Sequence, residues 1–122
     1  MNCAINQLIL ESIRTWIASS HSINVLARIE LRWIEVDALV AWTALEEFLT
    51  IIFFERQRDI SVAARTGSRT MTADETALLI SLIVARWDTA AAARCLRFFL
   101  SDISASAAAN AAARLRGALS RT

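Results

Sequence analysis

The absence of proline and the scarcity of glycine constrain this chain most. Its 122 residues include no Pro and only two Gly. Tight turns and hairpins depend on these residue types, because Pro presets the turn geometry and Gly adopts positive φ without a steric clash. A fold with many reversals is therefore disfavoured, and we expect few, long elements.

Length and hydrophobicity predict one domain, residues 1–122, that associates with itself. Apolar residues make up 56% of the chain, above the roughly 45–50% of ordinary soluble domains. Four Trp and five Phe add large apolar surfaces that a small bundle does not fully cover. Alanine runs such as 90–93 raise the percentage without adding much area. We expect a homo-oligomer, with a dimer as the favoured form.

The spacing of apolar residues predicts an all-α fold, a bundle of about four helices. In residues 2–18, apolar side chains recur every three or four positions, as on one face of a helix. Ser22 is a suitable N-cap for a second helix that runs to about Arg58, because no Gly or Pro interrupts that stretch. This second helix would be the long central element of the bundle.

Two further helices follow a loop over residues 59–70, where Gly67 lies among Ser, Thr and Arg. Thr72 and Glu75 have the spacing of a capping box, which predicts a third helix from there to about Ser101. Ser104 is the expected N-cap of a last helix, which runs from Ala105 to about Leu119.

The balance of charges argues against a dedicated nucleic-acid binder. The net charge is +1, with both signs interspersed along the chain, so no strong global field is expected. All thirteen basic residues are Arg. Rows of Arg can nevertheless contact successive phosphates, which leaves nucleic-acid binding as an alternative. The residues concerned are Arg56, Arg58, Arg65, Arg69, Arg114, Arg116 and Arg121.

The usual catalytic and metal-binding signatures are missing. His21 is the single histidine, so one chain cannot form a zinc site with two His ligands. Cys3 and Cys95 have the spacing of neither a disulfide framework nor a metal site. Gly67 and Gly117 are too far apart for a glycine-rich phosphate loop. We expect no metal and no cofactor, and the sequence does not favour an enzyme.

The chain has the features expected of a cytoplasmic protein. Polar residues such as Asn6 and Glu11 interrupt the first turns, which is unlike a signal peptide. Glu46 and Glu47 interrupt the most apolar stretch, so no transmembrane segment of about 20 residues is expected.

Several charged residues lie on the apolar side of their predicted helices. At about 100° per residue, Glu30 and Asp37 fall opposite the polar stripe of the second helix. Arg86, Arg94 and Arg97 fall off the polar stripe of the third. A charge that faces a protein core must be paired, since burying it alone is very costly.

Two interpretations of these charges are possible. In the first, the carboxylates and guanidinium groups meet as ion pairs between helices or between subunits. In the second, Arg86, Arg94 and Arg97 bind an anionic ligand in a polar pocket, where Glu30 or Asp37 acts as an acid or base.

The leading functional hypothesis is a non-catalytic, self-associating helical bundle that acts through protein–protein interaction. Small anionic-ligand binding or acid/base catalysis in the Arg/carboxylate pocket is one alternative, and nucleic-acid binding is the other. Trp42 lies at the edge of the polar stripe of the second helix, where we expect an exposed indole to mark a contact surface.

Overall fold

The computed structural model describes residues 3–18, 22–63 and 70–120, and within them every regular element is a helix. The helices are α1 (Cys3–Ala18), α2 (Ile23–Glu35), α3 (Leu39–Glu55), α4 (Ala73–Val84), α5 (Thr89–Leu96) and α6 (Asp102–Leu119). The prediction of an all-helical chain is confirmed, but with more and shorter helices than expected.

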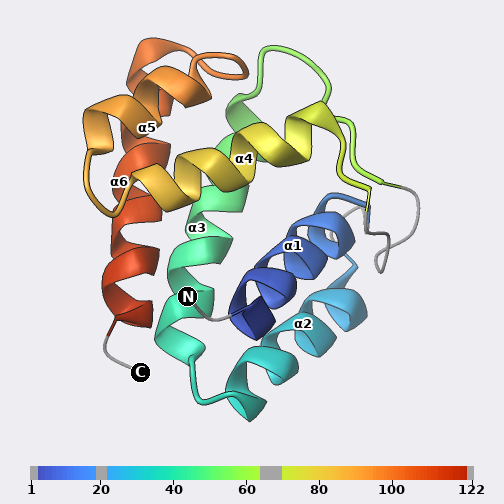
Figure 1. The fold of residues 1–122 in the computed structure, drawn as a ribbon. Helices are drawn as coiled ribbons and strands as arrows, with labels where there is room; N and C mark the ends of the chain where they lie inside the picture. The colour runs from blue at the N-terminus through green and yellow to red at the C-terminus, as the bar shows by residue number, and fades with distance from the viewer. Residues whose placement is uncertain (1–2, 19–21, 64–69, 121–122) are drawn as a thin grey trace.

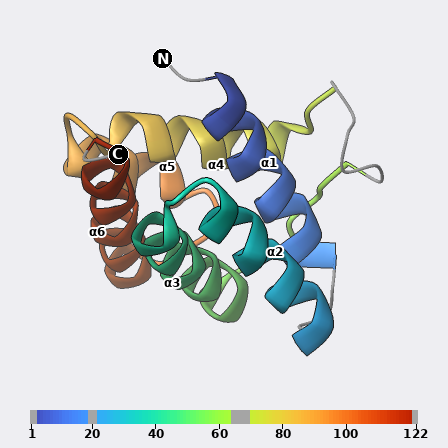
Figure 2. The same cartoon turned by 90° about the horizontal axis from the view of Figure 1, so that it is seen from below.

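The helices pack around a central antiparallel pair, α3 and α6 (Figure 1). Helix α4 crosses this pair, and α5 packs on α4 and α6 at one end of the molecule. Helices α1 and α2 lie beside each other on the other side of α3, as Figure 2 also shows. Each outer helix therefore covers part of the central pair.

The sequence of α3 and α6 explains why this pair is central. Helix α3 is apolar on most of its circumference and buries large side chains such as Phe48, Leu49 and Ile52. Helix α6 presents fully buried alanines, including Ala108 and Ala112. Because a methyl group takes little room, the two helix axes can approach closely while the large side chains of α3 fill the remaining space.

The long central helix predicted over residues 22–58 is in fact two helices, α2 and α3. Asp37 adopts a left-handed backbone conformation, with φ of 57°. The Asp37 N–H donates to the Ile34 carbonyl and the Ala38 N–H donates to the Trp33 carbonyl, both at 2.9 Å. This is the Schellman pattern that ends helices, normally with Gly at the left-handed position. Aspartate is one of the few other residues that tolerate it.

Substitution of Asp37 should reveal the free-energy cost of its left-handed conformation. We expect Asp37→Gly to be more stable than Asp37→Ala by about 1 kcal/mol, because both lose the carboxylate and only Gly escapes the penalty of positive φ. Urea unfolding of the two variants measures the difference directly. Equal stabilities would mean that residue 37 does not hold a left-handed conformation in solution.

The third predicted helix, residues 72–101, is also divided. Its start is correct, since the Thr72 side chain accepts from the Glu75 N–H at 3.0 Å in a complete capping box. The chain leaves the helix after Val84, and the Asp88 carboxylate caps α5 by accepting from the Ala91 N–H at 3.0 Å. Ser101, rather than Ser104, caps the last helix.

The expectation of an exposed Trp42 is wrong. Its side chain is 1% exposed, and its ring stacks on that of Trp33 with 6.3 Å between centroids. Trp33 is also buried, and its indole N–H donates to the Ser12 hydroxyl at 2.9 Å. The break at Asp37 reorients α2 relative to α3, so the two tryptophans join α1, α2 and α3 in one core. The exposed indole belongs to Trp87, at 73%.

Candidate interaction surface

Helix α2 has an apolar outer face as well as an apolar inner face. Ile29 and Trp33 point into the core. Ile23, Leu31 and Ile34 are 82%, 54% and 47% exposed. At 3.6 residues per turn these three side chains lie within one quadrant of the helix. An amphipathic surface helix normally carries polar residues on this side.

The turn after α2 extends this apolar area. Val36, Leu39 and Val40 are exposed, Val40 by 71%. The area is continuous along the chain from α2 to the first turn of α3 and is called the α2 surface below. It consists of Ile23, Ala27, Leu31, Ile34, Val36, Leu39 and Val40. Contiguous exposed aliphatic side chains of this kind mark interaction sites more often than scattered ones do.

Carboxylates border the α2 surface on the side of α3. Glu30 is exposed on α2 and lies close enough to Glu46 of α3 for their charges to interact. Partial burial and, to a lesser extent, the negative charge of Glu30 raise the pKa of Glu46 above its usual value. Asp37 is exposed at the turn. This border is therefore acidic, with two like charges held near each other.

The opposite border of the α2 surface leads into a groove between α1 and α2. The groove has a volume of about 410 Å³, with Ala18, Val25 and Ile29 among its lining residues. Arg28 and Arg32 also line it, and Arg32 donates to Glu11 of α1 at 2.6 Å. The groove has apolar walls with arginine at its rim.

The three arginines predicted as ligand-binding residues lie at the other end of the molecule. Arg94 and Arg97 are exposed on α5 and its C-terminal end, and Arg86 is exposed on the turn before α5. Arg97 forms an ion pair with the exposed Asp102 at 3.0 Å. The Arg86 guanidinium lies 5.3 Å from the centroid of the exposed Trp87 ring.

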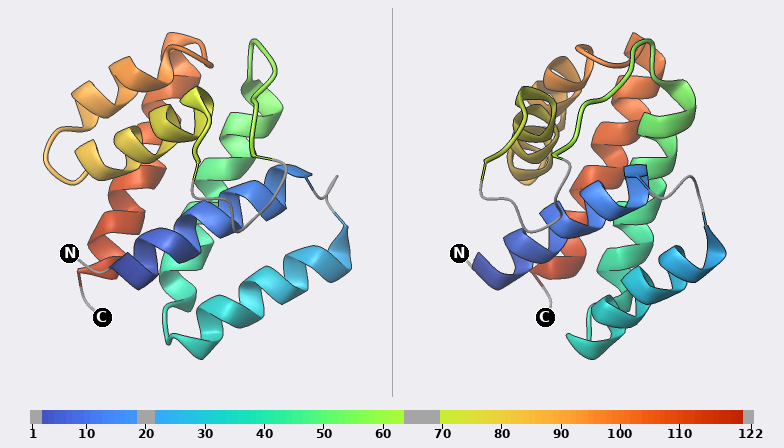
Figure 3. Two further views of the ribbon diagram at one scale, coloured as in Figure 1. Left: turned by 45° about the vertical axis from the view of Figure 1, so that its right-hand side comes forward. Right: turned by 90° about the vertical axis from the view of Figure 1, so that its right-hand side faces the viewer.

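The structure does not bring the predicted carboxylates and arginines together within one chain. Glu30 lies on α2, which packs on α1 and α3, whereas Arg86, Arg94 and Arg97 belong to the part of the chain that packs on α6. Helices α2 and α5 are at opposite ends of the molecule in Figure 1 and in both views of Figure 3. All five residues, Asp37 included, are exposed.

Arg86 has another guanidinium as its charged neighbour. Burial and, to a lesser extent, the nearby Arg86 lower the pKa of Arg116 on α6. Arg116 donates from Nε to the Leu82 carbonyl at 2.9 Å, at the C-terminal end of α4. A positive charge there is favoured by the helix dipole, so Arg116 serves to end α4.

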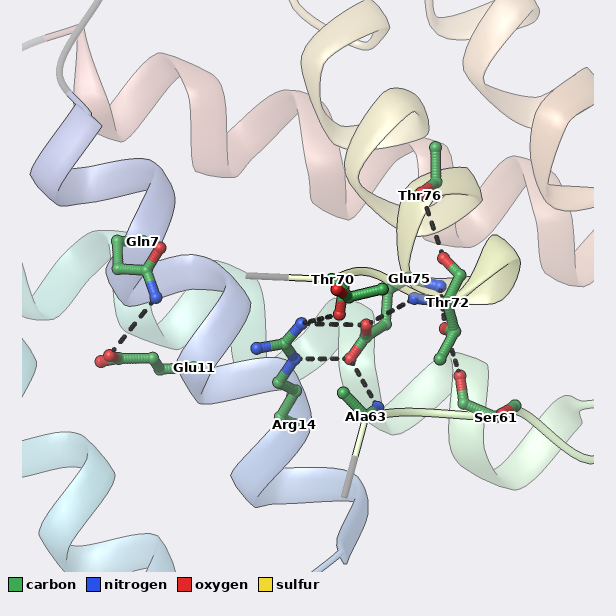
Figure 4. A network of polar contacts seen from close by, with 9 residues as sticks. All are labelled: Gln7, Glu11, Arg14, Ser61, Ala63, Thr70, Thr72, Glu75 and Thr76. Carbon is green, nitrogen blue, oxygen red and sulfur yellow. Dashed lines mark hydrogen bonds and ion pairs between the residues drawn. The ribbon is translucent and has the colours of Figure 1, made fainter. Parts of the chain in front are cut away.

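The described structure contains a buried ion pair that sequence reasoning missed. Arg14 of α1 and Glu75 of α4 form an ion pair with side chains 1% and 0% exposed, respectively. Arg14 donates from Nε to Glu75 Oε2 at 2.6 Å and from Nη2 to Oε1 at 3.1 Å (Figure 4). Such a bidentate pair satisfies both partners with a fixed geometry.

Glu75 also accepts two backbone hydrogen bonds. The donors are the N–H groups of Thr72 and Ala63, at 2.9 and 3.1 Å. Burial alone raises the pKa of Glu75, but hydrogen bonds from Arg14 and these N–H groups outweigh it and hold the pKa below its usual value. With every oxygen occupied, the pair joins α1, α4 and the connection between α3 and α4, and we assign it a structural role.

The arginines proposed for nucleic-acid binding are largely engaged with the protein itself. Arg58 donates to Asp74 at 2.6 Å, and its guanidinium lies 4.0 Å from the Phe98 ring centroid. Arg114 donates to Glu47 at 2.6 Å. Arg56 donates to the Phe53 carbonyl. Arg65, Arg69 and Arg121 lie outside the described residues, as does His21.

No group of three or more His, Cys, Asp or Glu side chains among the described residues could hold a metal ion. None of the helices described combines the length and the apolar character needed to cross a membrane.

Comparison with known proteins assigns the chain to no family. No protein family matches the chain, and no match was found among curated proteins or among solved structures. Function must therefore be inferred from the surfaces themselves.

Proposed function

We propose that this protein is a non-catalytic interaction module that associates with itself through the α2 surface. The observation that carries the proposal is the exposure of aliphatic side chains along α2 and the following turn, among them Ile23 at 82% and Val40 at 71%. Isolated exposed aliphatic residues are ordinary on a protein surface, but a contiguous set on a regular helix is typical of a contact site.

A few side chains can account for most of the free energy of such a contact. Burying a half-exposed Leu or Ile is worth about 1 kcal/mol, from the usual 1.5–3 kcal/mol for complete burial. Each 1.4 kcal/mol changes a dissociation constant about tenfold. Replacing two central aliphatic side chains with charged ones removes this gain and adds the cost of taking the charges out of water. Association should therefore weaken by about a hundredfold or more.

A double substitution tests the proposal. We expect the wild-type chain to sediment as an oligomer in the micromolar range, and Leu31→Asp combined with Ile34→Asp to sediment as a monomer. Light scattering coupled to size exclusion gives the mass of each species. Circular dichroism should show the same helical content in both, since the two side chains lie on the outer face of α2.

The matched control is Ile80→Asp, compared with Ile34→Asp alone. Ile80 lies on α4 and is 45% exposed, close to the 47% of Ile34. The same chemical change outside the α2 surface should leave association unchanged. A wild-type chain that is monomeric throughout the micromolar range, or equal effects of the two single substitutions, would contradict the proposal.

A further inference from the structure

A second surface, on and around α5, combines exposed aromatic rings with positive charge. Trp87 and Phe98 are 73% and 60% exposed. Three exposed arginines belong to the same part of the chain. The Arg86 guanidinium lies 5.3 Å from the Trp87 ring centroid, and Arg94 and Arg97 are exposed on α5 and its C-terminal end, Arg97 in an ion pair with Asp102. The two aromatic residues and the three arginines are called the α5 surface. Tryptophan, phenylalanine and arginine are the residue types most enriched where proteins contact each other.

The charges of the two surfaces are complementary. The α2 surface is bordered by Glu30, Glu46 and Asp37, whereas the α5 surface carries three guanidinium groups. Burial and, to a lesser extent, the charge of Glu30 raise the pKa of Glu46, so two carboxylates lie near each other at this border. Exposed arginines on the α5 surface of a second copy of the chain would offset their charges.

A two-fold contact would not use the arginines of the α5 surface. In an isologous interface the same surface faces itself, so the acidic border of one copy would meet either the acidic border of the other or the opposite border with Arg28 and Arg32. The first arrangement brings like charges together, which costs several kcal/mol, and in the second Arg32 already donates to Glu11. A contact between unlike surfaces places apolar residues on both sides and opposite charges at the border.

We propose that the α2 surface of one chain docks on the α5 surface of the next, head to tail. This inference rests on the proposed self-association and specifies its geometry. The carboxylates and arginines that the sequence sets on the apolar sides of their helices then meet between subunits. Leu31 and Ile34 would contact Trp87 and Phe98.

The positions of the two surfaces determine the kind of assembly. Helices α2 and α5 lie at opposite ends of the molecule (Figures 1 and 3). A head-to-tail contact leaves one free surface at each end of a pair, so copies continue to add until the assembly closes as a ring or grows as an open filament. An open filament should then grow continuously with concentration, whereas a ring should reach a fixed mass, and both should weaken with added salt.

Two variants that each lack one surface provide the test. One is the Leu31→Asp, Ile34→Asp variant described above. The other is Arg94→Glu combined with Arg97→Glu, for which Arg94→Lys with Arg97→Lys is the charge-preserving control. The Arg97–Asp102 ion pair is exposed, so its loss should cost less than about 1 kcal/mol of stability. Thermal melting followed by circular dichroism checks that both variants are folded.

We expect each variant alone to be monomeric and an equimolar mixture to form a dimer and nothing larger. In that dimer the intact α2 surface of the Arg94→Glu, Arg97→Glu chain contacts the intact α5 surface of the other. The Lys control should assemble like the wild type. Mass from light scattering distinguishes the species.

Other outcomes separate this inference from the proposed function. If the Arg94→Glu, Arg97→Glu variant assembles like the wild type while the α2 variant is monomeric, the α2 surface contacts itself, and only the head-to-tail arrangement is wrong. If both folded variants are monomeric and their mixture is too, the two surfaces do not bind each other. If the α2 variant assembles normally, the proposed function itself is wrong.

Discussion

Replacing Arg14 with methionine is expected to destabilise the protein by about 3–5 kcal/mol, the usual cost of removing one partner from a buried ion pair. Methionine fills most of the space of the arginine stem but leaves the Glu75 carboxylate, 0% exposed, without its cation. Two backbone N–H groups still donate to that carboxylate. They reduce the penalty without removing it, and urea unfolding at neutral pH measures the loss.

The pH dependence of this loss identifies its cause. In the wild type the lowered pKa of Glu75 gives stability that is complete above about pH 4.5 and is lost as the pH falls through the folded-state pKa. Without Arg14, burial dominates and the pKa of Glu75 rises instead. The two proteins should therefore differ most at neutral pH and converge in acid. A difference independent of pH would indicate lost packing rather than an unpaired charge.

A matched control comes from the exposed Arg32–Glu11 pair, in which Arg32 is 57% exposed. Glu11→Gln should change the stability by less than about 1 kcal/mol, because solvent screens the pair. Adding Glu75→Gln to Arg14→Met should recover part of the loss, since a neutral amide can remain buried at lower cost.

Enlarging Ala108 is expected to have the second-largest effect on stability. Its side chain is fully buried on α6, which packs closely against α3. Leucine at this position would overfill the core in which α6 packs on α3, α4 and α5. Overpacking of this kind usually costs about 1–3 kcal/mol, and thermal unfolding of Ala108→Leu should show it as a lower Tm.

The neighbouring alanine serves as the control. Ala107 is exposed on the same helix, and leucine has nearly the helix propensity of alanine. Ala107→Leu should leave Tm almost unchanged. If both substitutions were tolerated equally, the core around Ala108 would not be closely packed in solution.

Of the three helices with a side-chain N-cap among the described residues, only α4 was predicted at its correct start. Thr72 and Glu75 form the predicted capping box, and the first helix ends at Ala18 as predicted. The breaks at residues 36–38 and 85–88 were missed because neither contains Gly or Pro. Asp37 carries the left-handed conformation without either. Asp88 caps a helix with its side chain, within a stretch predicted to be one continuous helix.

The candidate surfaces could be predicted only in part. The periodicity placed Glu30, Arg94 and Arg97 on the apolar sides of the predicted helices, but all three are exposed. It could not show that the opposite side of α2 faces solvent, because that depends on where the chain turns at Asp37. Arg14 lies four residues after Leu10 and three before Ile17, and so on the same face of the helix as these apolar residues. This spacing was the signal in the sequence that Arg14 is buried. Its partner, Glu75, is 61 residues away, beyond the reach of any local pattern.

The distance in sequence between Arg14 and Glu75 also sets the order in which the two residues are synthesised. Arg14 is synthesised 61 residues before Glu75, which at about 5–20 residues per second corresponds to about 3–12 s. Through that interval α1 has its apolar side and its guanidinium group but not the carboxylate that neutralises it. Helix α1 can pair with α2 and α3 as they emerge, yet its anchoring to α4 must wait. A nascent chain thus carries an unneutralised arginine at its first helix until more than half of the protein has been translated.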